Sequence, residues 1–94
     1  MKRVYLMADM KRGLVARKSV DARLARNVID GYMASATRAI PPSCQWWLVE
    51  ADSADAARKC IEFERENGRG IQAWSLGGVS RAMPGRILAS GGAR

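Results

Sequence analysis

The chain has 94 residues, which is the size of one small domain. Sixteen lysines and arginines against nine aspartates and glutamates, with no histidine, give a formal net charge of +7. The hydrophobic content of 48% excludes a disordered chain, and two cysteines without histidine exclude a disulfide framework and an ordinary zinc site.

The N-terminal residues predict a strand and a hairpin. Residues 3–9 are expected to form a strand in which Val4, Leu6 and Ala8 share one face and Tyr5 and Met7 share the other. Residues 10–13 contain a glycine and are expected to turn the chain. Residues 14–19 are compatible with a second short strand, although their alternation is poor.

A first amphipathic helix is expected after this hairpin. Ser19 is a residue type that caps helices, and Asp21 would then lie in the first turn, where the helix dipole favours an acid. Pro41 ends the helix because proline cannot continue the hydrogen-bonding pattern. The apolar positions that follow the helical rhythm are Val20, Leu24, Ala25, Val28, Ile29, Tyr32, Met33 and Ala36.

The second half of the chain predicts a strand, a helix and another strand. Residues 45–50 form the strand, and Ser53 caps the helix that follows it. Asn67 and the glycine after it end this helix. Residues 71–76 form the last strand, and residues 77–94 are rich in glycine and arginine.

These elements predict an α+β fold, a small two-layer sandwich in β(β)αβαβ order. Two helices would pack on one face of a sheet of three or four strands, because the connections are short. Residues 1–76 would form the domain, and residues 77–94 would be a C-terminal extension. That extension is either flexible or contributes an edge strand through the RILA sequence at residues 86–89.

Two adjacent tryptophans raise the question of whether the second face of the sheet binds a partner. Trp46 and Trp47 point to opposite faces of their strand, yet the two helices would cover only one face. Three interpretations of the second face are open: the tail covers it, it is a protein interface, or it stacks nucleic-acid bases. The residues expected at a protein interface are Tyr5, Met7, Trp46 and Trp74.

The positive charge is concentrated at both ends of the chain. Residues 1–38 carry a net charge of +6, residues 39–66 carry −3 and residues 67–94 carry +4. Such a distribution favours phosphate groups or acidic partners. The residues expected to bind nucleic acid or an acidic partner are Lys11, Arg12, Arg17, Lys18, Arg23, Arg26, Arg81 and Arg86.

The sequence offers no catalytic constellation, so we expect no enzyme, no cofactor and no metal. Cys44 and Cys60 have no evident base partner. No signal peptide and no apolar run of membrane-spanning length is present, and we expect a cytoplasmic protein that does not enter a membrane.

We therefore expect a small basic binding protein that docks on a protein or a nucleoprotein complex. In size and style it is comparable to the inhibitors that phages and mobile elements direct at host systems, anti-CRISPR proteins included, although no motif matches such a family. The alternative is a protein that binds nucleic acid directly and without sequence preference. A homodimer, in which two open sheets pair, is a third hypothesis.

Overall fold

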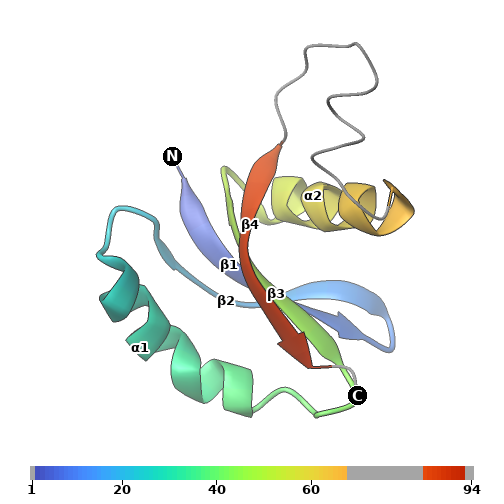
Figure 1. The fold of residues 1–94 in the computed structure, drawn as a ribbon, viewed down its shortest axis with the longest axis horizontal. Coiled ribbons are helices and arrows are strands. Elements are labelled where there is room, and N and C mark those ends of the chain that lie inside the picture. Colours follow the sequence, from blue (N-terminus) through green and yellow to red (C-terminus); the bar gives the residue numbers. More distant parts are fainter. Residues whose placement is uncertain (1, 68–83, 93–94) are drawn as a thin grey trace.

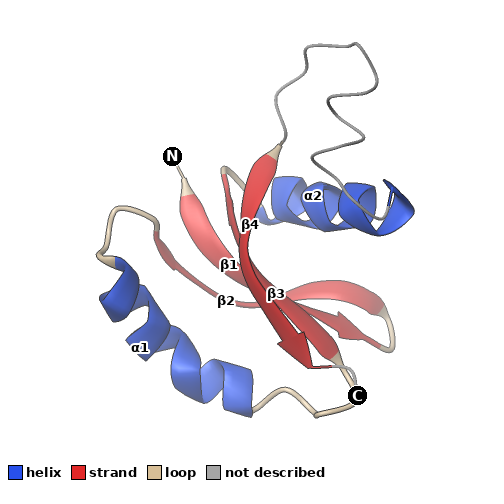
Figure 2. Ribbon diagram, viewed as in Figure 1, coloured by secondary structure: helices blue, strands red, loops and turns tan. Residues whose placement is uncertain are grey.

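A computed structural model describes residues 2–67 and 84–92 of the chain. It has a four-stranded antiparallel sheet and two helices, which confirms the α+β class (Figures 1 and 2). The elements in chain order are β1 (Arg3–Met10), β2 (Gly13–Asp21), α1 (Arg26–Arg38), β3 (Gln45–Ala51), α2 (Ala54–Asn67) and β4 (Gly85–Gly92).

The sheet has the strand order β2-β1-β3-β4, so β2 and β4 are its edges. β1 and β2 form the predicted hairpin, in which Met10 pairs with Gly13 and a two-residue turn joins them. Gly13 has a φ of 113°, a conformation that favours glycine. The hairpin thus places β2 at an edge of the sheet, where its residues are exposed or half-buried.

The first helix begins later than Ser19 and Asp21 predicted. Both residues belong to β2, where Ser19 pairs with Tyr5 and Asp21 with Arg3 of β1. The helix starts at Arg26, and its N-cap position makes no side-chain hydrogen bond. The prediction was wrong because pairing with β1 holds these residues in the extended conformation.

The second helix follows its prediction at both ends. The Ser53 hydroxyl accepts a hydrogen bond of 3.0 Å from the backbone N–H of Ala56, as an N-cap does. α2 ends at Asn67. The strand expected at residues 71–76 lies outside the described residues, and the fourth strand of the sheet is β4, which contains the RILA sequence.

The two helices cover opposite faces of the sheet, whereas one shared face was expected (Figure 2). Ile29 and Met33 of α1 pack with Leu6 and its neighbours on one face. Cys60 and Ile61 of α2 pack on the other. Both faces of β1 and β3 carry apolar side chains, so each face needs its own cover. We call these two cores the α1 core and the α2 core.

Candidate functional site

The residues expected at a protein interface do not meet on one open face. Met7 is buried in the α2 core with an exposed fraction of 1%, and Tyr5 packs against that core. Trp46 packs against the α1 core on the opposite face. Trp74 lies outside the described residues. The uncovered face that motivated this set is therefore closed by α2.

Each of the two adjacent tryptophans has a structural partner. The indole of Trp46 lies against the edge strand, because a Cβ atom added at Gly91 would come within 2.6 Å of the ring atom Cζ2. Trp47 is buried, and the guanidinium of Arg65 lies 5.7 Å from the centre of its ring. Arg65 also binds Asp9 with an Nη2–Oδ2 distance of 3.1 Å. The alternation predicted for this pair is confirmed, and both indoles belong to cores.

Four of the predicted cations lie on the β1–β2 hairpin. Lys11 and Arg12 form its turn and are exposed. Arg17 is exposed in a bulge of β2, where it has no partner residue across the strands, and Lys18 follows it. We call these four residues the basic hairpin. None of them forms an ion pair with any residue that the structure describes.

The remaining predicted cations are compensated by acids or lie elsewhere. Arg26 pairs with Asp30 at 3.0 Å, and Arg86 of β4 pairs with Glu50 at 3.0 Å. Arg81 lies outside the described residues. Arg26 and Arg86 therefore add little uncompensated positive charge to the surface.

Arg23 is also compensated. It pairs with Asp21 at 2.7 Å. Hydrogen bonds from the Arg23 side chain, and then from its backbone N–H, lower the pKa of Asp21 to about 2. The same pairing raises the pKa of Arg23.

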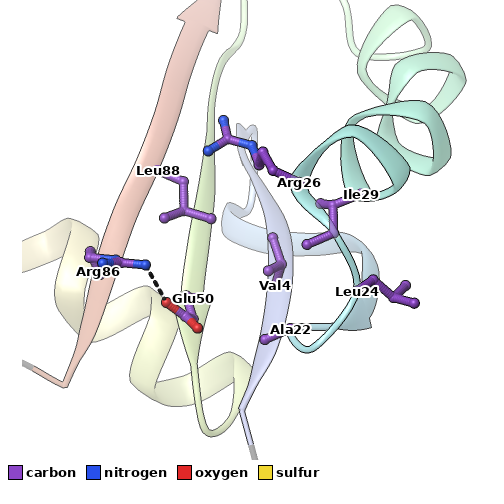
Figure 3. Close-up of a pocket in the computed structure, with 8 residues that line it drawn as sticks. All are labelled: Val4, Ala22, Leu24, Arg26, Ile29, Glu50, Arg86 and Leu88. Carbon is purple, nitrogen blue, oxygen red and sulfur yellow. Dashed lines mark hydrogen bonds and ion pairs between the residues drawn. The ribbon is translucent and has the colours of Figure 1, made fainter.

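A shallow pocket of about 180 Å³ lies between the N-terminal end of α1 and the sheet (Figure 3). Arg26 and Ile29 approach it from α1, while Leu88 approaches it from β4 (Figure 3). The Arg86–Glu50 ion pair closes one side. The pocket is smaller than the 300–1,000 Å³ that is typical of small-molecule sites. It is therefore a weak candidate for a cofactor or substrate site.

Three apolar residues of the predicted helical pattern, one before α1 and two on it, are exposed instead of buried. Among the described residues, the large hydrophobic side chains that remain exposed are Leu24 (38%), Val28 (38%) and Tyr32 (52%). The apolar residues of α1 extend around more of the helix than the side that packs on the sheet. Sequence analysis missed these residues because an apolar helical pattern does not tell which part of a wide arc is buried.

Cys44 is half-buried and Cys60 is buried, and neither is in a disulfide. Burial, with a contribution from Glu64, raises the pKa of the Cys60 thiol, which makes it a poor nucleophile. No group of three or more cysteines and carboxylates in residues 2–67 and 84–92 has an arrangement that holds a metal ion. No described helix is long and apolar enough to cross a membrane.

Comparison with protein-family models, with curated proteins and with solved structures gave no match. Charge and geometry are therefore the basis for the functional proposal.

Proposed function

We propose that the protein binds nucleic acid through the basic hairpin, by contacts to the phosphate backbone and without sequence preference. The main observation behind the proposal is that the cations of the basic hairpin have no acidic partner among the described residues, whereas four arginines elsewhere have one. Arg23, Arg26, Arg65 and Arg86 each have an acidic partner. The four cations of the basic hairpin have none among the described residues, so their attraction for an external anion is not reduced.

The spacing of these cations suits an extended anionic chain. Lys11 and Arg12 lie at one end of β2, and Arg17 and Lys18 lie near its middle. Arg17 lies five positions after Arg12, a distance of about 17 Å along a strand. Several phosphates of one nucleic acid would be needed to neutralise both pairs, whereas a single small anion could reach only one.

The aromatic residues favour backbone contacts over base recognition. Tyr5, Trp46 and Trp47 pack in or against the two cores. Stacking of bases on an open sheet needs such rings at the surface. Contacts limited to phosphates position a protein on nucleic acid but carry no direct sequence information.

Charged residues on an edge strand also prevent sheets from pairing edge to edge. If this protection were the only role of Arg17 and Lys18, removing the charges would promote aggregation and leave nucleic-acid affinity unchanged. The two roles thus predict different results for the same variants.

The test compares two variants that lose the same amount of charge. Lys11→Gln with Arg12→Gln removes two free cations of the basic hairpin, and Arg58→Gln with Lys59→Gln removes two cations that pair with Asp55 on α2. Affinity for a fluorescent DNA duplex of mixed sequence is measured by anisotropy over a range of salt concentrations.

We expect the hairpin variant to lose at least about tenfold in affinity at low salt. Each phosphate contact contributes about 0.9 to the slope of log K against log salt, so the slope should become shallower by about 1.8. The α2 variant should keep the wild-type slope. Equal losses in both variants, or no binding by the wild type at low salt, would overturn the proposal. A protein partner that survives nuclease in a pull-down, with no DNA binding, would favour docking on a protein instead.

A further inference from the structure

One acid, Asp9, lies close to the turn of the β1–β2 hairpin, and a residue of α2 neutralises it. Asp9 is the only acidic residue between positions 2 and 20 of the chain. It pairs with Leu14 of β2 and lies two residues before Lys11, the first residue of the turn. Its carboxylate is 3.1 Å from the guanidinium of Arg65, near the end of α2 that lies beside the hairpin (Figure 1).

Two contacts hold the Arg65 side chain in this place. Its Nη2 donates a hydrogen bond to Oδ2 of Asp9, and its guanidinium carbon lies 5.7 Å from the centre of the Trp47 ring. Trp47 is buried in the α2 core, and an aromatic ring attracts a cation placed over its face. Glu62 and Glu66 are closer to Arg65 along the chain, yet neither forms an ion pair with any described residue. Arg65 thus binds an acid 56 residues away instead of an acid of its own helix.

Both acids of β1 and β2 are neutralised by arginines that lie outside these strands. Asp21, at the far end of β2, pairs with Arg23, and Asp9 pairs with Arg65. The four cations of the basic hairpin have no acidic partner among the described residues. The charge that the hairpin presents to an external anion therefore depends on arginines that it does not contain.

Asp9 without a partner would weaken the basic hairpin in two ways. Lys11 and Arg12 follow it by two and three residues, so its carboxylate would compete with an external anion for their charges. It would also repel the phosphates that these cations contact. The Asp9 side chain is 35% exposed, so an approaching phosphate would meet its charge at the surface.

We infer that Arg65 controls the affinity of the basic hairpin for nucleic acid by neutralising Asp9. This inference rests on the function proposed above. Arg65 is a positioning residue in this arrangement, because its charge acts through the carboxylate that it holds. Its guanidinium is already engaged by Asp9 and by the Trp47 ring, and a direct contact between Arg65 and phosphate is the alternative that the test must separate.

The test measures affinity for the same DNA duplex by anisotropy at about 0.1 M salt, where the Debye length is about 10 Å and distant charges are largely screened. Arg65→Gln leaves Asp9 without its partner. The control Arg86→Gln removes the same charge from an ion pair on β4, at the opposite edge of the sheet from β2. Circular dichroism verifies that the variants are folded, which is expected because the Arg65 and Arg86 side chains are 50% and 74% exposed.

We expect Arg65→Gln to lose at least about threefold in affinity, because a unit charge about 7 Å from a phosphate changes affinity by about that factor even in water. The control should lose clearly less. Equal losses in the two variants would overturn the inference and leave the proposed function in place. A wild type that does not bind DNA would overturn the proposed function itself.

Two double variants that keep the wild-type net charge identify the group through which Arg65 acts. Asp9→Asn with Arg65→Gln removes both partners of the ion pair, whereas Arg65→Gln with Glu66→Gln removes an exposed acid of α2 instead. We expect the first to recover the affinity lost in Arg65→Gln and the second to stay at the level of that single variant. If neither recovers, Arg65 contacts the nucleic acid directly. If both recover, only the net charge matters, and either result would overturn the inference.

Discussion

The carboxylate of Asp21 is held by one neighbouring residue. It accepts hydrogen bonds from the Arg23 backbone N–H at 2.8 Å and from the guanidinium Nη2 at 2.7 Å. These bonds lie where the chain leaves β2 towards α1, whereas the sequence placed Asp21 in the first turn of the helix. They also favour the ionised carboxylate, which is why the pKa of Asp21 is lowered to about 2.

The first prediction concerns this pKa. A lowered pKa in the folded state means that the ionised Asp21 stabilises the protein above about pH 4, and this contribution is lost as the pH falls through 2. A carboxyl ¹³C NMR titration should show a midpoint near 2. In Arg23→Ala the midpoint should move part of the way back towards 3.8, because the backbone N–H still donates. A wild-type midpoint near 3.8 would contradict the arrangement.

Individual residues differ in how far the sequence alone predicts their position. Strand alternation correctly separated Trp46 from Trp47, because the side-chain period of two applies on either side of any sheet. The bulge at Arg17 was not predictable, since it depends on how β2 registers against β1. Arg17 owes its place in the candidate site to that register.

At the scale of elements, capping residues predict the start of a helix correctly when they do not pair with a strand. Ser53 caps α2 as predicted, because it follows β3 directly and does not pair with another strand. Ser19 has the same capping chemistry, but Tyr5 of β1 pairs with it. A local pattern cannot weigh a hydrogen-bonded partner that lies 14 residues earlier in the chain, so the start of α1 was wrong.

The second prediction concerns the contact between Trp46 and the edge strand β4. Gly91→Ala would bring a methyl group within 2.6 Å of the indole, so the ring or the strand must move. We expect a loss of about 1–3 kcal/mol in the free energy of unfolding. Gly31→Ala is the control, because it adds the same methyl group in open space on a helix and should gain about 0.5–1 kcal/mol.

Urea denaturation of both variants measures these changes. If Gly91→Ala were neutral, Trp46 would not pack on the edge strand, and its indole would again be available to a partner. A loss of stability in Gly31→Ala would show that the glycine has a structural role that its open surroundings do not reveal.

At the scale of the whole molecule, the fold class was predictable and the arrangement of layers was not. Local patterns predicted β1, β3 and the two helices, whereas β2 and β4 were left as alternatives. The placement of α1 and α2 on opposite faces depends on the strand order β2-β1-β3-β4, which no local pattern contains. Because of this difference, the face that was expected to be open is covered by a helix, and electrostatics is the main support for the proposed binding of nucleic acid.

The last prediction concerns whether the cations of the basic hairpin contribute to the stability of the fold. Lys11→Glu with Arg12→Glu lowers the net charge from +7 to +3 and removes no ion pair with a described residue. Repulsion between like charges is weaker in this variant. Its free energy of unfolding should therefore lie within about 0.5 kcal/mol of the wild-type value, or exceed it at low salt. The difference should shrink as salt shortens the Debye length from about 30 Å at 0.01 M to about 3 Å at 1 M.

Arg58→Glu with Lys59→Glu is the matched control for thermal unfolding. It changes the net charge equally, but it removes both cations that pair with Asp55 and brings like charges beside that acid. We expect it to be less stable than the hairpin variant at low salt. If the hairpin variant were instead the less stable of the two, Lys11 and Arg12 would support the fold, and loss of DNA affinity in hairpin variants would no longer identify a binding site. The proposed DNA binding therefore requires that Lys11 and Arg12 contribute to nucleic-acid affinity and not to the stability of the fold.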